Sequence, residues 1–105
     1  MPPLPTPHTV IVSRPTRSPD TYGGSEVDLQ VIAQYPCWVR QLSAVEVTDL
    51  GFHGTRIIRR FYFNGTPGVQ VDDRLMWEGE NHRVIRVRDI SSLEILTQID
   101  AVLEE

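Results

Sequence analysis

The sequence predicts a small all-β domain, an antiparallel β-barrel or sandwich with long loops and at most one short helix. Polar and apolar residues alternate through residues 26–35, the period of a strand with one buried face. Turn-forming residues recur too often along the chain for parallel βαβ units. The length of 105 residues suits one core. Closure of the sheet would also remove its exposed edges.

Proline dominates the first part of the chain. Six of the eight prolines lie within the first 19 residues, which excludes a helix there. We expect residues 1–7 to form an extended, polyproline-like arm and residues 8–105 to form a single barrel domain. A short strand is predicted over His8–Arg14, with Val10 and Val12 on one face. Residues 15–24 are rich in turn formers and are expected to form an exposed loop.

The clearest alternation predicts the next strand. Its expected buried face consists of Val27, Leu29, Val31, Ala33 and Tyr35. Ile32 is the one residue that breaks the alternation. Pro36 cannot donate a ladder hydrogen bond, so the strand should bend or lie at an edge there, before resuming over residues 37–42.

A short helix is expected within residues 43–54. Ser43 followed by Glu46 forms a capping-box pattern, and Gly51 can end the helix. A long strand then follows over Thr55–Phe63. Alternation places Ile57, Arg59, Phe61 and Phe63 on one face of that strand, and Arg56, Ile58, Arg60 and Tyr62 on the other.

Two further strand regions complete the predicted sheet. Asn64-Gly65 opens a turn-rich connection and is a hairpin signal. Residues 74–77 and 82–88 are expected to pair as a hairpin around residues 78–81. The last strand is predicted over residues 93–99, with Leu93, Ile95 and Ile99 facing inward and Glu94 and Gln98 facing outward.

Composition limits the classes of function. Fourteen acidic residues against ten basic ones give a net charge of −4, which argues against a surface built to neutralise nucleic-acid phosphates. All ten basic residues are arginines, which suit protein interfaces. The apolar runs are too short for a membrane span or a signal peptide, so we expect a soluble protein without membrane contact. Cys37 is the single cysteine and is interpreted as a small buried apolar residue.

No pattern supports catalysis. His8, His53 and His82 lie in separate elements, which does not favour a metal site. The acidic residues Asp72, Asp73, Glu78 and Glu80 are interpreted as turn formers and solvated hairpin charges. Neither a nucleophile elbow nor a phosphate-binding glycine loop is present in the sequence. We therefore expect no enzyme activity, no metal and no cofactor.

An oligonucleotide-binding barrel is the alternative interpretation. Arg83, Arg86 and Arg88 lie close together on one predicted strand. Stacking surfaces for bases could come from Trp77, Tyr62 and Phe63. Simple alternation, however, places Arg83 on the face opposite to Arg86 and Arg88, so that no single basic stripe results.

The order of these elements resembles the phage head-tail adaptor or head-closure family of connector proteins, over residues 8–100. The matching features, in chain order, are a first strand ending at Arg14, residues 20–24, a long strand leading to residues 38–42, residues 43–46, the strand 55–63, and residues 71–79 followed by 83–85.

The resemblance implies a β-barrel subunit of a ring, sixfold or twelvefold, around a channel through which double-stranded DNA passes. A portal or adaptor protein would lie above the ring, and a tail terminator or tail tube below it. The protein would be assembled in the host cytoplasm and would reside in the virion, at the head-tail interface. Head completion, or closure as a stopper, would be its role in genome packaging and DNA ejection.

Two sets of site residues follow from the resemblance. The segment after the second long strand would project into the channel, where the charges of Glu46 and Asp49 would repel phosphates and Leu50 and Phe52 would form a constriction. The alternative is a surface loop whose short helix packs on its own barrel. The whole gating set is Ser43, Glu46, Asp49, Leu50, Phe52 and His53. Contacts between subunits or rings are expected from Leu4, Arg14, Arg17, Asp20, Tyr22, Arg59 and Arg60.

Overall fold

The computed structural model describes residues 7–19, 25–65, 67–89 and 96–104, with the backbone alone at 17–19 and 25–27. It has six strands and one short helix: β1 His8–Pro19, β2 Ser25–Gln41, α1 Ala44–Asp49, β3 Ile58–Asn64, β4 Arg74–Trp77, β5 Glu80–Asp89 and β6 Leu96–Leu103. The predicted arm at residues 1–7 lies outside the described residues, apart from Pro7.

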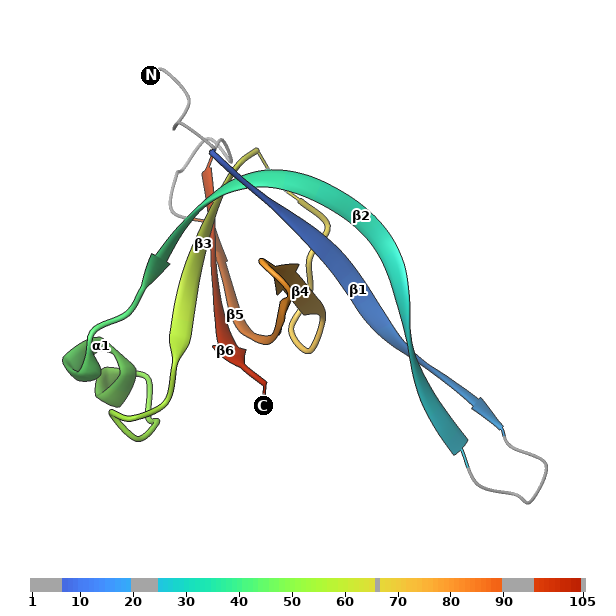
Figure 1. Cartoon of the computed structure of the whole chain (residues 1–105), viewed down its shortest axis with the longest axis horizontal. Helices are drawn as coiled ribbons and strands as arrows, with labels where there is room; N and C mark the ends of the chain where they lie inside the picture. Colours follow the sequence, from blue (N-terminus) through green and yellow to red (C-terminus); the bar gives the residue numbers. More distant parts are fainter. Residues whose placement is uncertain (1–6, 20–24, 66, 90–95, 105) are drawn as a thin grey trace.

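The six strands close into an antiparallel barrel. Their order around it is β1, β2, β3, β6, β5, β4, and β4 pairs back to β1 (Figure 1). The all-β prediction, with a closed barrel and one short helix, is therefore confirmed. The connection that begins at Asn64-Gly65 does not close a hairpin, because β3 pairs with β2 and β6.

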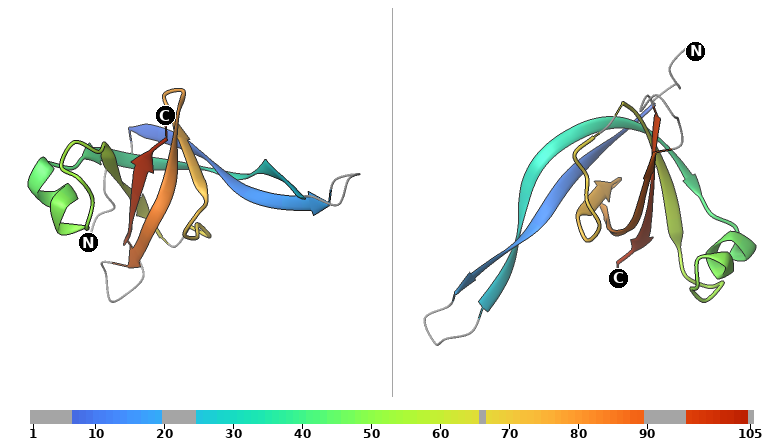
Figure 2. Two further views of the ribbon diagram at one scale, coloured as in Figure 1. Left: turned by 90° about the horizontal axis from the view of Figure 1, so that it is seen from below. Right: turned by 180° about the vertical axis from the view of Figure 1, so that it is seen from behind.

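Strands β1 and β2 continue beyond the barrel as a two-stranded arm (Figures 1 and 2). They pair from His8 with Cys37 to Pro19 with Ser25, whereas β1 pairs with β4 only over Ile11–Ser13. The prediction of a loop from residue 15 is thus wrong for residues 15–19, which extend the strand. β2 bends through a wide arc and transfers its pairing to β3 from Trp38 onward (Figure 1).

The barrel interior is filled by one apolar cluster that includes Val10, Val12, Phe61, Phe63 and Ile99. A second cluster lies outside the wall, under α1, and consists of Leu42, Val47, Ile58 and Val102. Strand alternation sends Phe61 into the first cluster and Ile58 into the second. Both faces of β3 are therefore buried near the helix, which alternation alone could not indicate.

Helix α1 begins as the sequence predicts. The Ser43 hydroxyl accepts a hydrogen bond from the Glu46 amide, and the Glu46 carboxylate accepts one from the Ser43 amide at 3.1 Å. After the last turn, Gly51 adopts a φ of +89°, which glycine reaches at little steric cost.

The last hairpin is also confirmed, as β4 and β5 joined by Glu78-Gly79. Both turn residues have positive φ, 51° and 77°, as a type I′ turn requires. The last strand, however, begins and ends later than predicted, at Leu96 and Leu103. Gln98 lies on the outer face opposite to the core residue Ile99, as predicted, but it is buried, because β6 is covered on both faces. The predictions for Leu93, Glu94 and Ile95 lie outside the described residues.

Candidate functional site

A β-bulge in β2 changes which face of the arm is apolar. Val12 pairs with Ala33, and Ser13, the next residue of β1, pairs with Val31. Ile32 is therefore the extra residue, and its break in the sequence alternation marks the bulge. Val31 and Leu29 thus share a face with Ser13 and not with the core residue Val12, because a one-residue shift reverses the side-chain pattern.

The bulge leaves an exposed apolar strip on the arm and the adjoining barrel wall. Leu29 is 47% exposed and Val31 is 65% exposed, so the prediction that they face the core is wrong. Ile11 and Met76 are cross-strand partners at the base of the arm and are exposed as well. The strip consists of Ile11, Leu29, Val31, Ile32 and Met76, and contiguous exposed apolar surface of this kind marks interaction sites.

A second bulge, in β5, brings three arginines to one face. Arg83, Arg86 and Arg88 pair with Val102, Asp100 and Gln98, which are alternate residues of β6. Since alternate residues of a strand share a face, the three arginines do too. The prediction that Arg83 points away from the other two is wrong, because Ile85 is an extra residue in the ladder. Sequence alternation cannot reveal this shift.

Two further arginines extend this face across the sheet. Arg40, Arg60, Asp100 and Arg86 form one row of directly opposite residues over β2, β3, β6 and β5. We call the surface made by Arg40, Arg60, Arg83, Arg86 and Arg88 the arginine face.

The part of the arginine face nearest α1 is neutralised within the subunit. Arg60 Nε lies 2.7 Å from Asp100 Oδ1, and the Asp100 side chain is fully buried. Both terminal nitrogens of Arg40 donate to the Glu46 carboxylate at 2.9 Å. The hydrogen bonds from Arg40 and from the Ser43 amide lower the pKa of Glu46 to about 2.

The remaining arginines of this region are less constrained. Arg83 approaches Asp72 at 3.7 Å, and both side chains are substantially exposed. Arg86 and Arg88 are exposed, and no carboxylate within the described ranges is within ion-pair distance of either.

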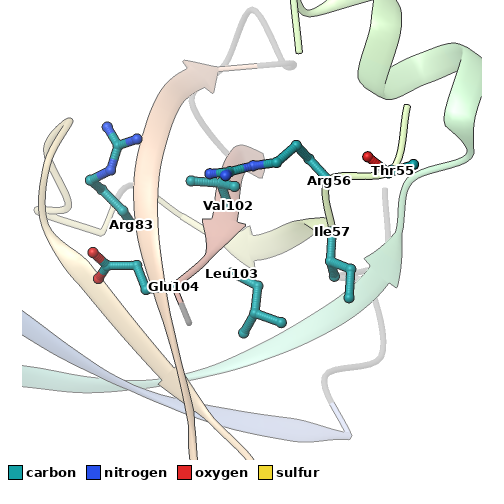
Figure 3. A pocket seen from close by; sticks show the side chains of 7 residues that line it. All are labelled: Thr55, Arg56, Ile57, Arg83, Val102, Leu103 and Glu104. Carbon is teal, nitrogen blue, oxygen red and sulfur yellow. The ribbon is translucent and has the colours of Figure 1, made fainter. Parts of the chain in front are cut away.

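A groove of about 490 Å³ lies beside Arg83, between the loop before β3 and the ends of β5 and β6. Arg56 and Arg83 project from its two sides, with Val102 between them (Figure 3). Ile57 and Leu103 add apolar surface, and the Glu104 carboxylate is held by Arg74 Nε at 2.6 Å. Sequence reasoning missed this groove, because its walls come from segments far apart in the chain.

The predicted gating residues gather around α1, at the end of the molecule away from the arm (Figures 1 and 2). Leu50 and Phe52 are partly buried against the second apolar cluster, so they serve the packing of their own helix. Glu46 is bound to Arg40 and does not present a free charge. The other three, Ser43, Asp49 and His53, are exposed.

Three of the predicted contact arginines are engaged within the subunit. Arg14 donates twice to the buried Asp73 at 2.9 Å, from Nε and from a terminal nitrogen. Arg59 lies over the Trp77 ring, with its guanidinium carbon 5.1 Å from the centroid, and also contacts Glu80. Arg60 holds Asp100. Of the other predicted contacts, Leu4, Asp20, Tyr22 and the side chain of Arg17 lie outside what the structure describes.

The acidic residues near β4 do not form a common site. Asp73 is buried on Arg14, while Asp72 and Glu78 occupy positive-φ turn positions. In the described part of the chain, no three His, Cys, Asp or Glu side chains are grouped to hold a metal. Cys37 is buried in the barrel core, as interpreted from the sequence.

Comparison with solved structures establishes the likeness of this fold to two known ones. Protein SF1141 from Shigella flexneri 2a is similar with a TM-score of 0.73 and 11% identity, over 91% of this chain and 90% of that one. A chain from the virion of a native gene transfer agent particle is similar with a TM-score of 0.64 and 14% identity, over 92% and 93%. One of these neighbours thus belongs to a virion.

Sequence identities of 11% and 14% show a shared fold, and they do not show a shared function. No family model matches the sequence, and no curated protein matches it. Among the residues that can be placed, no helix is both long and apolar enough to cross a bilayer.

Proposed function

We propose that the protein is a structural subunit of a phage-like particle. Copies of it would form the head-tail connector ring that joins portal and tail. The observation that carries this proposal is the exposed apolar strip on an arm that leaves the barrel. Support comes from the likeness of nearly the whole chain to a component of a gene transfer agent virion. Head completion, or closure as a stopper, is the role we assign within the connector.

The arm formed by β1 and β2 is suited to contact another chain. Beyond Ser13, β1 pairs only with β2 among the described strands, and β2 pairs with β3 only from Trp38 onward. An isolated two-stranded ribbon is marginally stable in water, and its unpaired edges invite further pairing. An arm that packs on a different patch of the next copy makes a heterologous contact, which closes into a ring.

The helix end of the subunit would face the channel. Asp49 and His53 are exposed there and remain candidates for contact with passing double-stranded DNA. Leu50 and Phe52 would instead hold α1 on the barrel, because they pack against the second apolar cluster.

The proposal is tested by the mass of the full-length protein in solution, alone and with its portal or tail partner. Native mass spectrometry should show rings of the wild type. Leu29→Ser with Val31→Ser should abolish them while the circular dichroism spectrum and melting temperature are retained. A matched control is Val45→Ser with Val71→Ser, because these valines are 71% and 55% exposed but lie outside the strip. Rings of the Leu29/Val31 variant as stable as those of the wild type would refute the proposal.

A further inference from the structure

A pair of aromatic residues lies on the outer wall of the barrel. Trp38 and Tyr62 are directly opposite each other in β2 and β3, and their ring centroids are 5.0 Å apart. Tyr62 stands between the core residues Phe61 and Phe63, so strand alternation points its ring outward. Trp38 is exposed and Tyr62 is partly exposed. We call these two residues the aromatic patch.

The charges beside the aromatic patch are balanced within the subunit. Arg40 and Arg60 lie on the same face, each two positions along its strand from the aromatic pair, and they are bound to Glu46 and Asp100. A partner that covers the patch would therefore not leave an unpaired charge buried, which would be costly. Tryptophan, tyrosine and arginine are also the residues that most often anchor protein interfaces.

The apolar strip lies on the opposite side of the barrel. Its residue Met76 is in β4, and two strands separate β4 from β3 in either direction around the barrel, β1 and β2 or β5 and β6. The arm and β3 accordingly lie on opposite sides in Figures 1 and 2. The strip and the patch cannot meet within one subunit, whereas copies placed side by side can bring them together.

The chemistry of the strip suits that of the patch. All five residues of the strip are apolar and uncharged, so they would cover the aromatic rings without disturbing the ion pairs of Arg40 and Arg60. A phosphate or an acidic peptide would instead meet two guanidinium groups that are already occupied by carboxylates. The patch therefore favours an apolar protein surface as its occupant.

We infer that the aromatic patch of one copy receives the apolar strip of the next copy. The inference rests on the proposed function, in which the arm contacts a different surface of a neighbouring copy, and it assigns that surface. Each copy would give its strip to one neighbour and its patch to the other. This is a heterologous contact, which closes into a ring.

The test uses two variants of the full-length protein, with native mass spectrometry and sedimentation equilibrium as the readouts. Trp38→Ser with Tyr62→Ser should abolish rings, and it leaves the strip intact. Leu29→Ser with Val31→Ser leaves the patch intact. When mixed, the two variants should form pairs of one copy of each, at least tenfold more tightly than either associates with itself. The pairs should not grow, because each variant has only one intact surface.

A second experiment does not depend on how the Trp38/Tyr62 variant folds. Tyr62→Cys is folded first and is then labelled with a bulky maleimide, to which the buried Cys37 should be inert. The labelled protein should form at least tenfold fewer rings than the wild type. The matched control is Thr55→Cys, labelled in the same way on an exposed residue outside both surfaces, which should form rings like the wild type.

Failure of this inference can be told from failure of the proposed function. Rings of the Trp38/Tyr62 variant as stable as those of the wild type would overturn the inference, while the Leu29/Val31 variant still tests the proposed function by itself. Self-association of the Trp38/Tyr62 variant would show that strip meets strip. Rings of this variant that no longer bind the portal or tail partner would show that the patch faces another ring. Either result, or a mixture without pairs, would also overturn the inference.

Discussion

The guanidinium of Arg60 closes on the carboxylate of Asp100 across strands β3 and β6, with Nε 2.7 Å from Oδ1. The Asp100 side chain is fully buried, and the Arg60 side chain is 17% exposed. Hydrogen bonding to Asp100 raises the pKa of Arg60 above its ordinary value, so the guanidinium is charged at every physiological pH. The barrel wall thus contains a buried charge that depends on one partner.

Loss of that partner should be costly. Arg60→Met should lower the free energy of unfolding by about 3 kcal/mol, because it leaves the Asp100 charge buried and unpaired. Arg88→Met, on an exposed residue of the same face, should change it by less than about 0.5 kcal/mol. Arg60→Met with Asp100→Leu should recover part of the loss. Urea denaturation measures all three, and equal stabilities of the two single variants would contradict this account.

His82 should make stability depend on pH. Its ring is fully buried, Nδ1 lies 3.2 Å from the Leu75 carbonyl and Nε2 lies 2.8 Å from a terminal nitrogen of Arg59. Arginine can only donate, so Nε2 accepts and Nδ1–H donates to the carbonyl, which requires a neutral ring. Burial, assisted by Arg59 and opposed by the Leu75 carbonyl and Glu80, lowers the pKa of His82 below its ordinary value of 6.5.

The sign of the effect follows from proton linkage. As pH falls below about 6.5, the unfolded chain binds a proton that the folded ring refuses, so stability decreases until the folded ring also titrates. Denaturation between pH 5 and 8 should show this loss, with a slope of at most about 1.4 kcal/mol per pH unit for one proton. His82→Gln should remove the slope, whereas His53→Gln, on an exposed residue, should retain it. An unchanged slope in His82→Gln would contradict the assignment.

Cys37 should be inert in the native state. Burial in the barrel core raises the pKa of its thiol to about 12, and the thiolate is the reactive form. We expect a thiol reagent at pH 8 to modify the native protein at least a hundredfold more slowly than the urea-unfolded chain. Rapid modification without denaturant would show that the barrel opens at Cys37.

Glu46 and Asp49 should respond differently to charge reversal. Glu46→Arg removes the capping box and the Arg40 ion pair, so the amides of Val47 and Leu50 should exchange hydrogen much faster. Asp49→Arg changes an exposed side chain and should leave their exchange within twofold of wild type. The Asp49 variant can therefore test the proposed channel charge without disturbing the helix. Rapid exchange in both variants would show that α1 also depends on Asp49.

The sequence was sufficient to predict the barrel, the helix and the last hairpin because local chemistry determines them. Ser43 and Glu46 carry a capping box, and Glu78-Gly79 suits a turn with positive φ at both positions. The last strand was misplaced because β6 is buried on both faces. Thr97 lies on the inner face, where alternation expects an apolar residue, and Gln98 and Asp100 are buried on the outer face, where alternation expects exposed residues.

The candidate surfaces were less predictable because register decides them. Each β-bulge moves every following side chain to the other face of the sheet. The bulge at Ile32 interrupts the alternation in the sequence, whereas the bulge at Ile85 leaves no such mark. Of the arginines expected at interfaces, Arg14 and Arg60 have buried carboxylate partners, and these partners could not be predicted because they are distant in sequence.

The continuity of β2 has a mechanical consequence. One 17-residue strand begins in the arm and crosses the barrel wall, and only two residues separate its end from the first residue of α1. Tension applied to the arm would therefore travel along covalent bonds to the helix, without passing through a flexible joint. A force on the arm would therefore act on α1 as well, so that β2 mechanically couples the partner bound at the arm to the surface that α1 faces.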